Sequence, residues 1–383
     1  MAAHSYSLFL FSLSFVVLIP TLQAHIAEYD DYWKARKLEA IENLNKAYHP
    51  NPEEMVHHYN DQFAKTMIKL NNTRRVLKGM KENGPCEITN PVDSCWRCDP
   101  NWEKNRKRLA DCAPGFARGT TGGKEGEFYV VTDPSDDILN PKPGTLRHAV
   151  IQRRPLWITF KRSMIITLEQ ELIITSNKTI DARGANVQIA KGAGITVQFV
   201  KNVIIHGLHI HHIITGTGGT IRDAEDHFVL LFGASDSYTG DQKMQITVAL
   251  NHFGKGLVER MPRCRHGFIH VVNNDYTHWL MYAIGGSRNP TIISQGNRYT
   301  ASSTLASREV TKRVYAPPEV WKKWNWISEG DHFENGAFFV SSGDPKASKK
   351  YGIDKMMPFN PGEMAPKLTQ YAGTLNCKPG KPC

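Results

Sequence analysis

The chain has 383 residues, 40% of them hydrophobic, which is enough for one large domain with a sizeable core beside a small one. Its 47 Lys and Arg exceed its 37 Asp and Glu, and the net charge of +10 predicts an acidic partner such as pectin, a glycosaminoglycan or a membrane surface. Nucleic acid would fit the charge, but no nucleic-acid-binding motif is present, so none is expected.

The N-terminus has the pattern of an export signal. The apolar run Leu8–Ile19 is too short to span a bilayer and is followed by Leu22–Ala24, which predicts a signal peptide at residues 1–24. No later segment is apolar over a membrane-spanning length. Two sequons, Asn71–Thr73 and Asn177–Thr179, are compatible with a secreted glycoprotein.

Residues 25–82 are expected to form a small α-helical domain. A first helix is predicted by apolar residues at helical spacing, and His49–Pro52 ends it. A second helix begins where Asn51 provides an N-cap and Glu53 and Glu54 lie in the first turn. Its apolar stripe comprises Met55, Tyr59, Phe63 and Met67. We expect this stripe to pack on the main domain, with binding of a partner as the alternative.

The chain contains seven cysteines, an odd number. In a secreted protein they are candidates for disulfides, and one of them must lack a partner within the chain. Cys95 and Cys98 also have the CxxC spacing of a metal or redox site, but no second pair at zinc spacing accompanies them. Cys377 and Cys383 are close enough to close a short C-terminal loop. The remaining cysteines are Cys86, Cys112 and Cys264.

The rest of the chain, residues 83–383, is predicted to be an all-β domain. Its first part, up to residue 126, is rich in Cys, Gly and charge and is expected to be irregular. Short β-rich runs punctuated by turn residues follow, with no helix-period segment of comparable strength between them. The predicted strands are Phe128–Thr132, Trp157–Phe160, Met164–Leu168, Leu172–Thr175, Ile195–Phe199, Val203–Ile205, Val229–Phe232, Gln245–Leu250, Phe268–Val272 and Thr291–Ser294.

A repeat of constant period lies within these strands. Asn251–Phe253, Asn274–Tyr276 and Asn297–Tyr299 each read Asn-x-aromatic, and each begins 23 residues after the one before. Such a period predicts a β-solenoid in which the Asn amides form a ladder and the aromatic rings stack inside. A β-sandwich with chance spacing is the alternative, although it would favour hairpins every 8–12 residues.

Three guanidiniums fall within the segment Arg260–Arg265. Arg263 and Arg265 are two residues apart, so they share one face of a strand. Pro262 separates them from Arg260, as proline does at edges and bulges. Because Arg is always charged, three together are expected to face anions; a solvated basic patch is the alternative.

These features, and several longer motifs, resemble the plant pectate lyase family. The resemblance covers the chain from about residue 85 to its end, and the helical N-terminal region is similar to the extra domain of pollen and anther members. The matching segments are Asn90–Cys98, Pro143–Arg147, Asn177–Gly184, Ile221–Asp223, Ser235–Tyr238, Asn251–Phe253, Arg260–Gly267, His270–Tyr276, Tyr282–Gly286, Ser294–Tyr299 and Gly330–Gly336.

The resemblance implies a right-handed parallel β-helix, secreted to the cell wall as a monomer, that cleaves de-esterified homogalacturonan by β-elimination with Ca²⁺. It assigns Arg260 as the catalytic base and Arg265 as a group that binds a substrate carboxylate. Arg263 lies between them and is expected to support substrate binding. An Arg base needs a lowered pKa, and neighbouring cations shift it in that direction.

The chain departs from the family at the calcium site. The family's acidic ligands belong to a Trp-Ile-Asp-His motif and an Asp-Gly-x-x-Asp motif, and neither occurs here. A gap of roughly 40–60 residues, about two solenoid rungs, is placed near Phe228, which also stands where a substrate-binding Lys is expected. We therefore predict no metal ligand. Asp223, Glu225 and Asp226 precede the gap and are read as a solvated acidic turn, with a replacement calcium site as the alternative.

The missing segment leaves alternatives to lyase activity: a non-catalytic homogalacturonan-binding wall protein, or the product of a skipped exon. The gap also predicts that Cys264 is the unpaired cysteine. Other candidate contacts have plainer readings. Lys243 is expected to be a solvated turn residue. Trp279 and Tyr282 are expected either to stack on sugars or to fill the core. The pair His209 and His211 has metal-binding spacing but lacks a third ligand.

Overall fold

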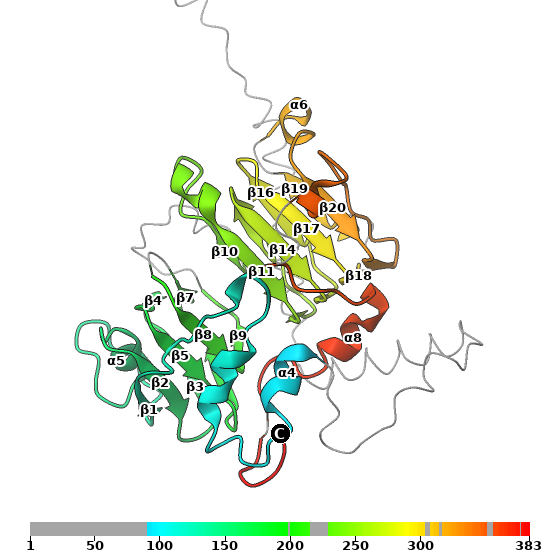
Figure 1. Ribbon diagram of the computed structural model, residues 1–383. Helices are drawn as coiled ribbons and strands as arrows, with labels where there is room; N and C mark the ends of the chain where they lie inside the picture. The colour runs from blue at the N-terminus through cyan, green and yellow to red at the C-terminus, as the bar shows by residue number, and fades with distance from the viewer. Residues whose placement is uncertain are drawn as a thin grey trace, which may run out of the picture. The chain divides into compact units, whose positions relative to one another are not determined.

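The computed structural model describes residues 90–197, 200–214, 229–302, 307–313, 316–350, 355–375 and 377–383. The predicted signal peptide, the helical N-terminal domain and the acidic segment before Phe228 lie outside these residues. Short parallel strands form two stacks, as Figure 1 shows. The predicted parallel β-helix is confirmed. No described helix is long and apolar enough to cross a membrane.

The first stack has three parallel sheets, in the strand orders β1-β2-β5-β8, β3-β6-β9 and β4-β7. Apolar side chains from successive rungs meet in one core, which includes Leu156, Ile158, Ile180 and Val187. The strands are β1 (Glu127–Val131), β2 (Leu156–Phe160), β3 (Met164–Ile166), β4 (Leu172–Ile173), β5 (Lys178–Asp181), β6 (Val187–Ala190), β7 (Ile195–Thr196), β8 (Val203–His206) and β9 (Leu208–His211).

The second stack repeats this plan with the orders β10-β13-β16-β19, β11-β14-β17-β20 and β12-β15-β18-β21, again all parallel. Its strands are β10 (Leu231–Phe232), β11 (Gln245–Ala249), β12 (His252–Phe253), β13 (Arg263–Arg265), β14 (Phe268–Val272), β15 (Asp275–Thr277), β16 (Ile284–Ser287), β17 (Thr291–Gln295), β18 (Arg298–Thr300), β19 (Thr311–Arg313), β20 (Trp326–Glu329) and β21 (His332–Glu334).

The predicted Asn ladder and aromatic stack run through this second stack. The Nδ2 of Asn251 donates to the Oδ1 of Asn274 (2.9 Å), and the Nδ2 of Asn274 donates to the Oδ1 of Asn297 (3.0 Å). The ladder ends on the Oδ1 of Asp331, which accepts from the Nδ2 of Asn297 (3.0 Å). Inside, four rings stack in the order Phe253, Tyr276, Tyr299 and Phe333, with centroids 4.6, 4.8 and 5.6 Å apart.

The two stacks are not joined by strand pairing within the described part of the chain. The strands that face the break are also less buried than those behind them. All four residues of β5 are buried, whereas those of the adjacent β8 are half-buried or exposed. Likewise β13 is fully buried and the neighbouring β10 is half-buried. Two open solenoid ends are what a loss of rungs at this point would leave.

The segment expected to be irregular contains short helices: α4 (Pro91–Trp96) and the 3₁₀ helices η3 (Arg106–Cys112) and η4 (Gly115–Ala117). The expectation was wrong, and for α4 the reason is a local cap that outweighs the polar composition. The side chain of Asn90 accepts a hydrogen bond from the amide of Asp93, and a proline takes the first helical position. The other helices are α5 (Leu146–Val150), η5 (Thr239–Lys243), α6 (Pro318–Trp321), α7 (Ala347–Lys350), η8 (Gly362–Met364) and α8 (Ala365–Leu368).

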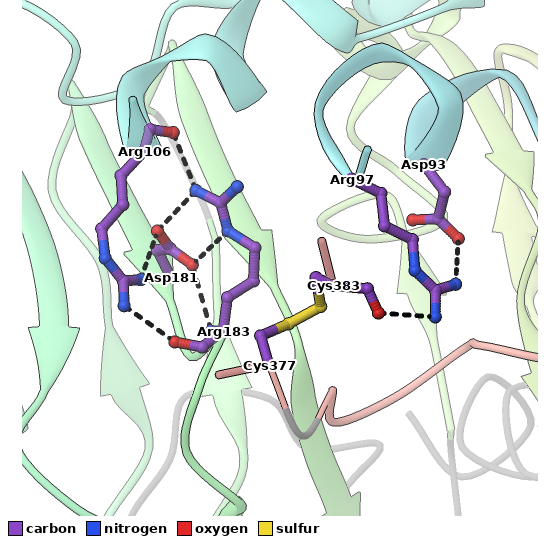
Figure 2. The surroundings of a disulfide bond; sticks show 7 residues. All are labelled: Asp93, Arg97, Arg106, Asp181, Arg183, Cys377 and Cys383. Carbon is purple, nitrogen blue, oxygen red and sulfur yellow. Dashed lines mark hydrogen bonds and ion pairs between the residues drawn. A yellow bond between two sulfur atoms is a disulfide. The ribbon is translucent and has the colours of Figure 1, made fainter. Parts of the chain in front are cut away.

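The cysteines form disulfides, as predicted. Cys95 bonds to Cys112, Cys98 is also disulfide-bonded, and the predicted C-terminal loop is closed by Cys377 and Cys383. The redox and metal interpretations of the CxxC spacing are therefore wrong for this structure. Near the C-terminal bridge, the Nη2 of Arg97 donates to the Cys383 carbonyl (3.0 Å), as Figure 2 shows.

A buried ionic cluster lies at the end of β5, and Figure 2 draws its main members. Asp181 accepts from the Nη1 of Arg106 (3.0 Å), the Nη2 of Arg183 (2.7 Å) and the Nε1 of Trp157 (3.1 Å). Burial alone would raise the pKa of Asp181, but the two guanidiniums outweigh it and hold that pKa far below its usual range. Burial, followed by the charge of Arg183, lowers the pKa of the neighbouring His206 to about 4.

Candidate active site

The arginine segment lies on a central strand of the second stack. β13 pairs with β10 on one side, through Leu231 and Arg263, and with β16 on the other, through Arg263 and Gly285. Cys264 belongs to the apolar core, so the residues on either side of it point to the outer face of the strand. The prediction that Arg263 and Arg265 share one face is confirmed.

Arg260 precedes β13 and is fixed by its neighbours. It has a left-handed backbone (φ 66°), and its side chain is buried. Its Nε donates to the hydroxyl of Tyr282 (2.7 Å) and lies 3.2 Å from the Oε1 of Glu259. Tyr282 is brought there by its parallel bridge to Glu259. Burial raises the pKa of Tyr282 well above its usual range, which keeps its phenol neutral.

Arg265 is held by hydrogen bonds and an ion pair to the loop that follows β10. Its Nη1 donates to the carbonyls of Gly233 and Ala234, both at 3.2 Å, and its Nε lies 3.3 Å from the Oδ1 of Asp236. Burial lowers the pKa of Arg265 from its ordinary value. The three arginines are all buried, at 4%, 2% and 2% exposure for Arg260, Arg263 and Arg265, so the alternative of a solvated basic patch is wrong.

Asp236 is a second acidic residue of this site, beside Glu259, and the sequence predicted no role for it. Besides Arg265, its Oδ1 accepts from the hydroxyl of Ser287 (2.7 Å), and its Oδ2 lies 3.5 Å from the Nε of Arg288. The signal that could have found it is its place in Ser235–Tyr238, one of the segments that resemble the family.

Several other residues that were candidates for substrate or metal contacts are instead buried, exposed to solvent or paired with other residues. Trp279 is in the apolar core and Tyr282 is buried, so both fill the interior rather than offering a face to a sugar. Lys243 is exposed at the end of η5. The two histidines have separate partners: His211 lies 2.9 Å from the Oε1 of Gln188, and His209 contacts Thr374.

The described residues do not fit a calcium site. Ca²⁺ takes six to eight oxygen ligands, usually with several carboxylates. Among the residues that the structure describes, no group of three or more His, Cys, Asp or Glu is placed to hold a metal ion. The two carboxylates beside the arginines are already engaged: Glu259 lies against Arg260, and Asp236 is shared by two guanidiniums and a hydroxyl.

Cys264 is the free cysteine of the described chain, and it is fully buried between the two outward arginines. Burial raises the pKa of its thiol far above the usual range, so the thiolate is not accessible at neutral pH. The prediction of an unpaired Cys264 is confirmed, and its role in the structure is to pack the core.

Comparison with known proteins connects this site to a family. A family model described as "Pectate lyase, N terminus" matches residues 25–77, and one described as "Pectate lyase" matches residues 224–361. A probable pectate lyase of Solanum lycopersicum is 51% identical, over 99% of this chain and 98% of its own length. The chain belongs to the pectate lyase family. A pectate lyase of Lilium longiflorum is also 51% identical, over 98% of this chain and 99% of its own.

The same alignments show that this pectate lyase family member is short. The alignment with the tomato relative runs over 442 positions, at least 59 more than the 383 residues of this chain. The chain therefore lacks at least that many positions that its relative has, which is close to the predicted length of the gap; the place of the gap near Phe228 stays a prediction. Among solved structures, the major allergen of cedar pollen is similar, with a TM-score of 0.66 and 39% identity over 75% of this chain and 99% of its own.

Proposed function

We propose that the protein is a secreted pectate lyase that cleaves de-esterified (1→4)-α-D-galacturonan by β-elimination. The observation that carries this proposal is the similarity to pectate lyases over 98–99% of the chain, together with a buried arginine site. A net charge of +10 suits a polyuronate substrate, because the excess of cations draws the polyanion to the protein.

The reaction needs a base and a means to stabilise negative charge. The base takes the proton at C5 of a uronate, the C–H electron pair forms the C4–C5 double bond, and the C4–O bond breaks. The departing oxygen then takes up a proton, which leaves a 4,5-unsaturated end. Guanidiniums beside the C6 carboxylate stabilise the enolate-like anion that forms on the way. Arg263 and Arg265, which share the outer face of β13, are the proposed carboxylate-binding residues.

Arg260 is the proposed base, and its surroundings also define the rival function. Glu259 lies 3.2 Å from its Nε, and a carboxylate at that distance favours the charged guanidinium over the neutral base. The described residues also lack a fitting calcium site, which is a second argument against cleavage. Both observations favour the second candidate, a protein of the same family that binds homogalacturonan without cleaving it.

The deciding experiment measures the ultraviolet absorbance of unsaturated uronate released from polygalacturonate by the full chain. The assay is run at alkaline pH, with added Ca²⁺ and with a chelator, on the wild type and on Arg260→Ala. Lys243→Ala is the matched control, because Lys243 is an exposed cation of the same stack. Release that Arg260→Ala abolishes and Lys243→Ala retains supports the lyase. Binding of polygalacturonate by a folded protein, without release, supports the second candidate.

A further inference from the structure

A carboxylate in the middle of an arginine site requires an explanation when the substrate is a polyanion. Asp236 repels uronate carboxylates, so its charge by itself weakens substrate binding. It nevertheless lies within 3.5 Å of two guanidiniums, those of Arg265 and Arg288. Its side chain is 29% exposed, compared with 2% for Arg265 and 62% for Arg288, so it bridges a buried cation and a solvent-facing one.

We propose that Asp236 is the positioning residue of the arginine site. It holds Arg265 and Arg288 in the orientation that binds uronate carboxylates. This inference rests on the proposed function for its substrate class. Asp236 touches neither substrate nor reacting atoms in this proposal, and it acts only through the two guanidiniums and the hydroxyl of Ser287.

The register of the strands explains how Asp236 can contact side chains of two further rungs. Asp236 follows β10, Arg265 lies on β13, and Ser287 pairs with Arg265 from β16. Three consecutive rungs, each about 4.8 Å from the next, are thus linked by one side chain. The Oδ1 accepts from Ser287 and faces the Nε of Arg265, while the Oδ2 faces the Nε of Arg288.

The loop that carries Asp236 is itself fixed. Asp241 accepts from the amide of Ala234 through its Oδ2 (2.6 Å), and His266 lies 3.3 Å from the carbonyl of Asp236. Gly233 has φ 113°, and a Cβ there would meet the Cβ of Arg265 at 2.8 Å, so the loop lies directly against that arginine. A positioning role requires a rigid loop, because a fixed backbone keeps the carboxylate of Asp236 in one position.

The two possible roles of Asp236 predict effects of opposite sign. If Asp236 were only a negative charge, its neutralisation would remove repulsion and strengthen binding of polygalacturonate. If it positions the guanidiniums, the same change weakens binding and turnover, because a charge-assisted contact that orients them is lost. Asp236→Asn keeps the size of the side chain and is therefore the informative variant.

The control is Asp241→Asn, which removes the same charge from the same loop. Asp241 contacts the backbone amide of Ala234, a bond that an amide oxygen can also accept. We expect Asp236→Asn to weaken the binding of polygalacturonate about ten-fold at fixed ionic strength and to lower kcat. Asp241→Asn is expected to bind equally well or more tightly. Equal or tighter binding by Asp236→Asn as well would overturn the proposal.

A second measurement separates this inference from the proposed function. The Nε–H signal of Arg265 in a proton–nitrogen NMR spectrum is expected to shift and to exchange faster with water in Asp236→Asn, but not in Asp241→Asn. An unchanged Arg265 signal overturns the positioning role whether or not the protein binds pectate. Failure of the wild type to bind polygalacturonate, with the signal changed as expected, overturns the proposed function instead and leaves Asp236 as the group that orients Arg265.

Discussion

The two stacks of the solenoid have the same backbone plan but stabilise their rungs with different chemistry. The first stack relies on charge: Asp181 lies between Arg106 and Arg183, and the side chains of Asp181 and Arg183 are fully buried while that of Arg106 is 14% exposed. The second stack relies mainly on neutral groups, the Asn ladder and the stacked rings, and adds a buried ion pair between Asp275 and Arg298. A repetitive sequence is needed for the second arrangement, whereas the first requires only that three unrelated side chains meet.

The difference affects how much stability each stack should lose when one side chain is removed. A ladder of identical amides distributes its hydrogen bonds over several rungs, so the loss of one amide costs a fraction of the total. A buried ion cluster concentrates its interactions on one carboxylate, and removing that carboxylate leaves a fully buried cation, Arg183, and a partly buried one, Arg106, without compensation. The arginine site belongs to the second stack, where Asp236 is a shared carboxylate, as is the buried Asp275 between Arg298 and His252.

The largest effect is expected for Asp181→Asn in the first stack. Loss of the charge leaves the buried Arg183 and the partly buried Arg106 beside a neutral amide, and we expect a loss of about 3–5 kcal/mol in the free energy of unfolding. Urea unfolding followed by circular dichroism would measure it. Asp111→Asn is the matched control, because Asp111 pairs with Lys124 at an exposed site where about 1 kcal/mol or less is expected. Equal effects of the two changes would refute the comparison.

A pH-dependent effect is expected at the end of the Asn ladder. Burial raises the pKa of Asp331 from 3.8 to about 6, against the opposing hydrogen bonds from Ser294, Ser328 and Asn297. Folding therefore favours the protonated carboxyl, and this contribution to stability is complete below about pH 4 and is lost as the pH rises to about 6.

The size of that effect follows from the pKa, since each unit is worth about 1.4 kcal/mol. We expect Asp331→Asn, which is neutral at every pH, to gain roughly 2–3 kcal/mol over the wild type between pH 4 and pH 7. Unfolding free energies of both proteins at the two pH values would show it. A constant difference between wild type and variant would contradict the assignment.

The smallest effect is expected for a single amide of the ladder. Asn274→Ala removes the acceptor of both the backbone amide and the Nδ2 of Asn251, and the donor to Asn297. We expect a loss of about 1–3 kcal/mol, because buried polar groups lose a partner. Asn251→Ala, at the exposed end of the same ladder, should cost less. If thermal unfolding ranked the two variants the other way, the ladder would not be the source of the stability.

Much of the second stack was predictable because its pattern is periodic. The spacing of Asn251, Asn274 and Asn297 predicts the ladder, and alternation predicts that Arg263 and Arg265 share a face. The N-terminal rungs have no such period. Lys178 lies in a strand yet is fully buried, and its Nζ donates to the carbonyls of Arg154 and Ser176. No local rule predicts that a lysine will be buried there.

Residue identity and spacing along the chain were sufficient to predict the family, the parallel solenoid, the unpaired Cys264 and the missing calcium motifs. That Asp236 faces Arg265 and Arg288, that Tyr282 bonds to Arg260, and that Asp181 compensates Arg106 is evident only in the folded chain. The reason is physical: a solenoid brings residues more than twenty positions apart to neighbouring rungs, and charge interactions depend on that distance in space.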